Sequence, residues 1–288
     1  ILWKKNKINH HWIDVYEGKL FIPSRKFVNL PKDLKIKSPS KIFLKECKTK
    51  NSVFDTILII DENNGKILKE IDLMKKLLLN EKIIEILNEN YNSNTNICKD
   101  PLHLNDVKVI DNSDLNNLKG IFPKLSKNDL ILSFRSINTI IFYDYKKSIV
   151  KHIVYNLFDK QHSPRIFKDG FLYVFDNNPS GKNSKILKIN LKTNSIDSIF
   201  ESNKFKSDVR GRIQFFKDKL FVQSSSQGEV FEIVCKNEFF NNCKQNYLYS
   251  SNFSFFYPSD LYDTSKTYKK DAIYIADFYD KEYVKFLD

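Results

Sequence analysis

The sequence predicts an all-β fold, more narrowly a β-propeller, and two observations lead to this prediction. First, short runs of alternating apolar residues recur along the chain and are separated by turns rich in Asp, Asn and Gly, a pattern typical of short antiparallel strands. Second, these runs group into repeats of roughly 40–50 residues, the length of a four-stranded propeller blade. We therefore expect a six-bladed propeller, of which this chain holds about five blades and part of a sixth.

The repeats can be delimited along the chain. Each has a first strand, a turn, a strongly apolar second strand, and then a hairpin around a polar turn. Runs such as 56–60, 130–134 and 171–175 supply the apolar strands. The expected blades are His11 to Leu73, His103 to Val154, His162 to Phe200, Gly211 to Tyr249 and Phe256 to Leu287.

The domain organisation follows from length and composition. A chain of 288 residues with 41% hydrophobic content can bury a full core, and no domain boundary stands out, so we expect one propeller domain over residues 1–288. The start at Ile1 reads like the middle of an outer strand, so the N-terminus is expected to be truncated. No apolar stretch has the length of a transmembrane helix, and no stable membrane insertion is expected of this chain.

One segment has a different periodicity. Residues 67–90 carry apolar side chains at helix-like spacing, among them Leu73, Leu77, Ile83 and Leu87. The sequence therefore predicts a short helical insertion near 67–90, between two blades.

The charge of the chain bears on its partners. The net charge is +12, with 47 Lys and Arg residues, but only Arg25, Arg135, Arg165, Arg210 and Arg212 are arginines. Because nucleic-acid surfaces favour arginine for bidentate recognition, and Lys, Asn, Ile, Phe and Tyr share A/T-rich codons, we do not expect nucleic acid as a partner. A basic surface still favours small anions. Oligomer formation is left open.

The four cysteines allow two interpretations. Cys235 and Cys243 flank a loop of hairpin length, so a disulfide between them is easily formed, which leaves Cys47 and Cys98 as a second pair. Four free thiols in a reducing compartment fit the spacing equally well. No pair forms the CxxC spacing of a zinc site.

The histidines give the strongest functional signal. The chain has five, and His11, His103 and His162 each begin a repeat, where the inner strands of a propeller meet at one tunnel mouth. Asn105 lies two residues after His103, on the same face of a regular strand, and Arg135 follows the next strand. Three imidazoles, an amide and a guanidinium around one tunnel predict an anion-binding site with nucleophilic capacity.

Four segments together resemble the bacterial aryl sulfotransferases that do not use a nucleotide sulfate donor. They are residues 100–107 (Asp-Pro-Leu-His-Leu-Asn-Asp-Val), 129–138, 161–164 (Gln-His-Ser-Pro) and 175–178 (Phe-Asp-Asn-Asn). The resemblance implies a six-bladed propeller in the periplasm. It also implies sulfuryl transfer from a phenolic sulfate ester to a phenol acceptor, by a ping-pong route through a sulfated histidine, without a cofactor or metal.

The resemblance also implies roles for single residues. His162 matches the histidine that becomes sulfated, and His103 with Asn105 matches the His-x-Asn pair of the site. Arg135 matches the arginine after the serine strand, and His11 the first-blade histidine, although His10 is adjacent. One departure is that the family's Ser-Ser-Arg-His-Gln reads Ser-Phe-Arg-Ser-Ile at 133–137 here.

Two other classes of function remain open at the level of sequence. One is a non-catalytic propeller that binds a ligand or a protein. The other is a metal-dependent propeller hydrolase or lyase, in which His11 and His103 would bind a metal with Asp14 or Asp106.

Overall fold

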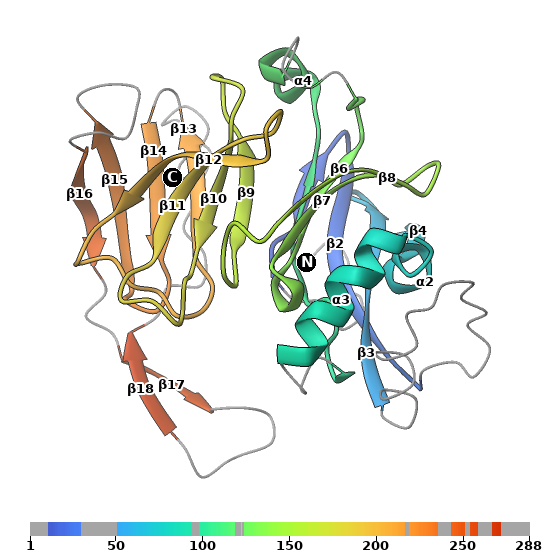
Figure 1. The fold of residues 1–288 in the computed structure, drawn as a ribbon, viewed down its shortest axis with the longest axis horizontal. Coiled ribbons are helices and arrows are strands. Elements are labelled where there is room, and N and C mark those ends of the chain that lie inside the picture. Colours follow the sequence, from blue (N-terminus) through green and yellow to red (C-terminus); the bar gives the residue numbers. More distant parts are fainter. Residues whose placement is uncertain are drawn as a thin grey trace. The chain divides into compact units, whose positions relative to one another are not determined.

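The computed structural model describes residues 11–29, 51–93, 98–118, 122, 124–216, 219–235, 243–250, 254–258 and 267–271. The chain divides into two compact units, residues 1–157 and 158–288, and each is described by itself (Figure 1).

The first unit contains two four-stranded antiparallel sheets. In both sheets the strands follow one another in chain order, β1-β2-β3-β4 and β5-β6-β7-β8. The first sheet consists of β1 (Asp14–Tyr16), β2 (Lys19–Asn29), β3 (Asn51–Asp61) and β4 (Ile67–Asp72), and the second of β5 (Leu104–Val109), β6 (Leu130–Phe134), β7 (Thr139–Asp144) and β8 (Ile149–Tyr155). Every residue of β6 and β7 is buried, which explains why these strands read as continuous apolar runs rather than as strict alternation.

The helices of the first unit correct one prediction. The helical insertion begins at Leu73, with α2 (Leu73–Leu77) followed by α3 (Glu81–Ser93). Residues 67–72 are strand β4 instead, because Ile67 and Ile71 pair with β3, and Asp72 then caps α2 by accepting a hydrogen bond from the Lys75 amide. The first unit also contains the short helix α4 (Asn112–Leu118) and a 3-10 turn, η2 (Arg135–Ile137).

One large apolar cluster joins most of these elements. Leu73, Met74 and Leu77 of α2 are buried together with Ile83 and Ile86 of α3. They pack in the same cluster as β3, β5, β6 and β7 side chains, so the insertion is part of the core of this unit and not a surface excursion.

The second unit contains two further four-stranded sheets and a hairpin. One sheet consists of β9 (His162–Ile166), β10 (Leu172–Asp176), β11 (Lys185–Asn190) and β12 (Ser195–Glu201), and the other of β13 (Arg212–Phe216), β14 (Lys219–Ser224), β15 (Glu229–Cys235) and β16 (Cys243–Ser250), again in chain order. The hairpin pairs β17 (Ser254–Pro258) with β18 (Thr267–Asp271). Ser163 of β9 links the two sheets, because its Oγ lies 3.2 Å from both the carbonyl oxygen and the amide nitrogen of Ile213.

An aromatic core fills the second unit. Phe205 packs edge-on against Phe175 and Phe231, with ring centroids 5.2 and 5.3 Å apart. Gly211 lies directly against this core: a Cβ at this position would come within 2.4 Å of the Phe175 ring. Only glycine therefore lets the chain enter β13 at this point.

The all-β class and the repeat bounds are confirmed for the described residues. The four sheets cover 14–72, 104–155, 162–201 and 212–250, which matches the first four predicted repeats to within a few residues. The fifth predicted repeat falls mostly outside the described residues.

The preferred disulfide is confirmed too. Cys235 and Cys243 are bonded to each other across the β15–β16 hairpin. Cys98 is also in a disulfide, whereas the pairing predicted for it, with Cys47, lies outside the described residues.

Candidate functional site

His11 and His103 lie side by side in the first unit. Their Nε2 atoms are 3.1 Å apart and their ring centroids 5.2 Å apart. His103 directly precedes β5, and His11 lies three residues before β1. Both residues have a left-handed backbone, with φ of 64° and 54°. Such a φ is uncommon for histidine and recurs at functional sites.

A carboxylate sets the protonation of His103. Its Nδ1 lies 2.6 Å from Asp100 Oδ2, and since a carboxylate only accepts, Nδ1 carries a proton and donates it. Nε2 of His103 lies 3.1 Å from Nε2 of His11, so the two rings share a hydrogen bond whose donor is the ring that carries the proton on Nε2.

Arg25 completes the cluster. Its Nη2 donates to Asp100 Oδ2 at 3.0 Å and also lies 2.9 Å from His103 Nδ1. Because His103 Nδ1 is itself protonated, this second contact is not a hydrogen bond. The two nitrogens are close because both donate to Asp100 Oδ2. On the other side, Arg25 Nε lies 3.6 Å from Asp55 Oδ1, and Asp55 Oδ2 accepts the Leu104 amide at 3.0 Å. Asp55 therefore ties Arg25 to the start of β5.

Arg135 and Asn105 lie in the same unit. The Arg135 amide donates to the His103 carbonyl at 3.0 Å, so the two backbones are in contact. Asn105 is 2% exposed and occupies a bulge, because the pairing register shifts between Leu104 and Asp106. A bulge breaks the two-residue alternation, so the argument that placed Asn105 on the face of His103 does not hold here, and its role in the site stays a prediction.

His162 is the first residue of β9 in the second unit and is 4% exposed. Its Nδ1 lies 2.6 Å from Asn177 Oδ1 and 3.1 Å from the Lys160 carbonyl oxygen. Both neighbours are acceptors, so Nδ1 carries the proton. In the neutral ring the lone pair is then on Nε2.

The orientation of the Asn177 amide is fixed by its other contacts. Its Nδ2 donates to the Ser207 carbonyl at 2.6 Å and to the Arg210 carbonyl. Only the NH₂ group can serve two carbonyl oxygens, so Oδ1 must face His162. Asn177 itself is fully buried.

Asp176, the residue before Asn177, is a perturbed acid. Burial raises the pKa of Asp176 to about 6. Hydrogen bonds from the Asp159 and Asn178 amides act in the opposite direction, but their effect is smaller. Those amides lie 2.8 and 3.2 Å from Asp176 Oδ1. The carboxyl thus holds the 159–160 and 177–178 backbones on either side of His162.

Comparison with known proteins establishes the family. The model of the family described as Arylsulfotransferase (ASST) matches residues 7–241. The chain belongs to the arylsulfotransferase family. A search of curated proteins finds no match.

Two solved structures are similar to this arylsulfotransferase-family chain. A protein of unknown function from Bacteroides caccae is 16% identical, with a TM-score of 0.39, and the match covers 69% of this chain and 56% of that one. Hydrazine synthase from Kuenenia stuttgartiensis is 16% identical, with a TM-score of 0.29, and the match covers 36% of this chain and 29% of that one. The chain thus spans only part of the length of either structure.

Four polar residues around the histidines of the two units were not predicted from the sequence of this arylsulfotransferase-family chain: Arg25, Asp55, Asp100 and Asn177. Asp100 and Asn177 lie inside segments that carry the resemblance, but nothing in their spacing shows that they face a histidine. Arginine is rare in this chain, and that rarity was the one signal that could have drawn attention to Arg25.

The predicted site residues fall in both units. His11, His103, Asn105 and Arg135 belong to the first unit and His162 to the second, so their convergence on one pocket stays a prediction. Within the described residues, no three His, Cys, Asp or Glu side chains are grouped so that they could hold a metal ion. No helix in the described part of the chain is long and apolar enough to cross a membrane.

Proposed function

We propose that this arylsulfotransferase-family protein moves a sulfuryl group from a phenolic sulfate ester to a phenol acceptor in two steps, with His162 as the nucleophile. The observation that carries this proposal is the 2.6 Å contact between His162 Nδ1 and Asn177 Oδ1, which assigns the ring proton to Nδ1 because the amide oxygen only accepts. The lone pair of the neutral ring is therefore on Nε2, as a nucleophilic imidazole requires.

The two steps balance as follows. In the first, the Nε2 lone pair of His162 forms the N–S bond while the S–O bond to the aryl group breaks, and the phenolate leaves with the electron pair. In the second, the oxygen of the acceptor phenol forms the new S–O bond, the N–S bond breaks, and its electron pair returns to Nε2. The acceptor phenol loses its proton to a base and the departing phenolate gains one.

The first-unit cluster, formed by His11, His103, Asp100 and Arg25, can supply the proton transfers that the two steps need. His103 and His11 share a hydrogen bond between Nε2 atoms, so the pair can take a proton from the acceptor phenol and return one to the leaving phenolate. Arg135 would stabilise the charge of the sulfuryl oxygens, and Asn105 would bind the same group through its amide. These roles require the two units to meet around one substrate.

We further propose that the four-stranded sheets are blades of one six-bladed propeller domain. Each sheet is a meander in chain order, and Ser163 links the first strands of two successive sheets, as expected where inner blade strands meet. An extracytoplasmic, periplasmic location is supported by the disulfide between Cys235 and Cys243. No cofactor enters the proposed reaction.

A turnover assay tests the proposal. The protein is incubated with nitrophenyl sulfate and a phenol, and we expect nitrophenol release that depends on the acceptor. His162→Ala should abolish both this release and the sulfuryl adduct detected on the wild-type chain by mass spectrometry. His152→Ala is the matched control, because His152 packs against Phe122 with ring centroids 4.6 Å apart and has no role in the proposed reaction.

Other outcomes would point elsewhere. Turnover that survives in His162→Ala contradicts the histidine intermediate. Ligand binding without turnover in the wild-type protein favours a non-catalytic binding module. Turnover that is lost with a chelator and restored by a metal favours the metal-dependent hydrolase.

A further inference from the structure

We propose that Asn177 is a positioning residue that makes His162 a nucleophile instead of an acid–base group, and that residues 206–211 form the clamp that holds Asn177 in the required orientation. This inference rests on the proposed function of His162. It adds a residue outside the predicted site and explains why two histidines of one chain would do different work.

The two histidines differ in the chemistry of their Nδ1 partner. His103 faces a carboxylate, Asp100, at 2.6 Å, and His162 faces a neutral amide oxygen, that of Asn177, at the same distance. A nearby carboxylate favours the doubly protonated ring, which has no lone pair. An amide oxygen orients the ring and fixes its tautomer without adding negative charge, so the Nε2 lone pair is retained.

Asn177 also suits the covalent state. When Nε2 bonds to sulfur, the ring gains positive charge while Nδ1 keeps its proton. The hydrogen bond to Asn177 Oδ1 then becomes charge-assisted and stronger than in the neutral ring. Because it strengthens as the N–S bond forms, it stabilises the transition state more than the free enzyme.

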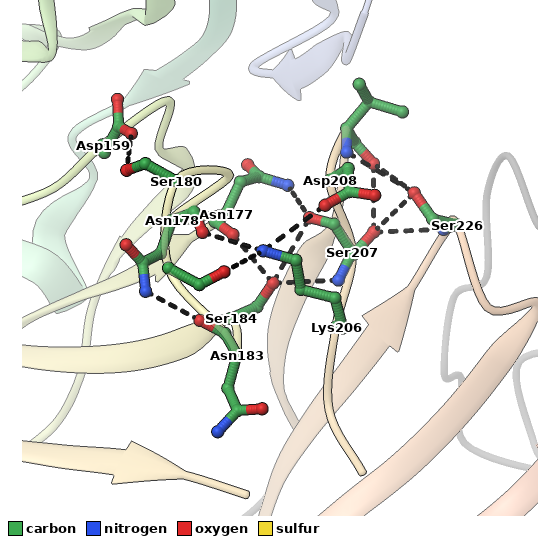
Figure 2. Close-up of polar contacts among 12 residues, drawn as sticks. Asp159, Asn177, Asn178, Ser180, Asn183, Ser184, Lys206, Ser207, Asp208 and Ser226 are labelled. Carbon is green, nitrogen blue, oxygen red and sulfur yellow. Dashed lines mark hydrogen bonds and ion pairs between the residues drawn. The ribbon is translucent and has the colours of Figure 1, made fainter. Parts of the chain in front are cut away.

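The clamp is a dense polar network that holds the carbonyl oxygens to which Asn177 donates (Figure 2). Ser184 Oγ donates to the Asn177 carbonyl at 2.9 Å and accepts the Ser207 amide at 2.9 Å. Ser207 Oγ donates to the Val209 carbonyl at 3.0 Å and accepts the Ser226 amide at 3.0 Å. Ser184 and Ser207 are fully buried.

Lys206 closes the network on its other side. Its Nζ donates to the carbonyls of Asn178 and Gly181 at 2.8 and 2.9 Å and lies 3.3 Å from Asp208 Oδ1. The ammonium therefore joins the 178–181 loop, which directly follows Asn177, to residues 206–208, which include the Ser207 carbonyl that Asn177 binds. Both acceptors of the Asn177 NH₂ group are backbone carbonyls of residues 206–211. Fixing this backbone therefore keeps the Asn177 amide from rotating.

The test reads the tautomer of His162 directly. Protein with ¹⁵N-labelled histidine is examined by NMR, with the His162 signals assigned by their loss in His162→Ala. In the wild-type protein we expect Nδ1 protonated and Nε2 not. Asn177→Ala leaves Nδ1 only the longer contact with the Lys160 carbonyl at 3.1 Å, so it should raise the share of the other tautomer. It should also slow the burst of sulfation from nitrophenyl sulfate about tenfold, the effect of one hydrogen bond. Asn177→Asp should keep Nδ1 protonated and protonate Nε2 as well at neutral pH.

Asn178→Ala is the matched control. Asn178 Nδ2 donates to the Asn183 carbonyl at 2.8 Å in the same loop, so the change removes one side-chain contact of the loop. It keeps the Asn178 carbonyl that Lys206 binds and does not touch His162. The proposal is overturned if Asn177→Ala leaves the wild-type tautomer in place, or if Asn178→Ala shifts it and slows the burst as much. Turnover that persists in His162→Ala would instead contradict the proposed function, while the tautomer result could still hold.

Discussion

At the residue scale, short polar side chains determine what the histidines can do. His103 is held by Asp100 and Arg25, and His162 by Asn177. Each partner is an acceptor for Nδ1, so in both rings the second nitrogen faces away from the partner. The same residue type therefore has two chemical environments, one charged and one neutral.

Asp176 gives a prediction on stability. Its pKa is raised from 3.8 to about 6 by burial, so the native state holds a proton that the unfolded chain has lost between those pH values. The stabilisation is complete below pH 3.8 and is lost as the pH rises through about 6. Asp176→Asn keeps the Oδ1 acceptor and is neutral at every pH. We expect the variant to be more stable at pH 7 than the wild type, by on the order of 2–3 kcal/mol.

Urea unfolding at several pH values checks this. At pH 4 the wild type and Asp176→Asn should have nearly the same free energy of unfolding, which serves as the internal control. A variant whose stability falls between pH 4 and pH 7 as steeply as that of the wild type would show that Asp176 is not the titrating group.

At the scale of elements, the strand pairs and the inserted helices follow from local pattern and pairing. Ile67 and Ile71 look helical in the sequence but pair with β3, because an apolar residue next to a strand can satisfy either periodicity. Strand β4 ends at Asp72, which is also the N-cap residue of helix α2. The β15–β16 hairpin is joined by the bond between Cys235 and Cys243, eight residues apart.

Removal of this disulfide should destabilise the second unit. In Cys235→Ser/Cys243→Ser, the unfolded chain regains the entropy that the closed loop removes. We expect a loss of about 2–3 kcal/mol in the free energy of unfolding, measured by urea denaturation without reductant.

The control for this experiment is a second comparison, made with reductant. Dithiothreitol should remove most of the difference in the free energy of unfolding between wild type and variant. Any decrease that dithiothreitol causes in both proteins alike comes from the disulfide of Cys98. Equal stability of the two proteins without reductant would contradict the prediction.

At the scale of the whole molecule, the open question is whether the first-unit cluster and His162 serve one substrate. The prediction is tested by binding. In His162→Ala, which cannot turn over, calorimetry gives the affinity for an aryl sulfate. Adding Arg135→Ala should weaken it about tenfold, since a hydrogen bond to a charged group is lost.

Lys82→Ala in the same background is the control for loss of charge. Lys82 of α3 is half-buried and pairs with Glu85 at 3.0 Å, and its removal lowers the net charge of the chain equally. If both changes have the same small effect on affinity, Arg135 does not bind the sulfuryl group and the predicted convergence is wrong.

The sequence by itself determined most of the strands and their grouping into four-stranded repeats, and it placed His11 and His103 at equivalent positions of two repeats. These depend on local periodicity and on equivalent positions within a repeat, which a single sequence contains. The tertiary structure alone decided which side chains hold the histidines. Arg25 reaches His103 from 78 residues away. Asn177 lies near His162 through the pairing of β9 with β10, and the carbonyls of Ser207 and Arg210, in the segment between β12 and β13, orient its amide. Such contacts depend on how separate loops pack, and no spacing along the chain encodes that packing.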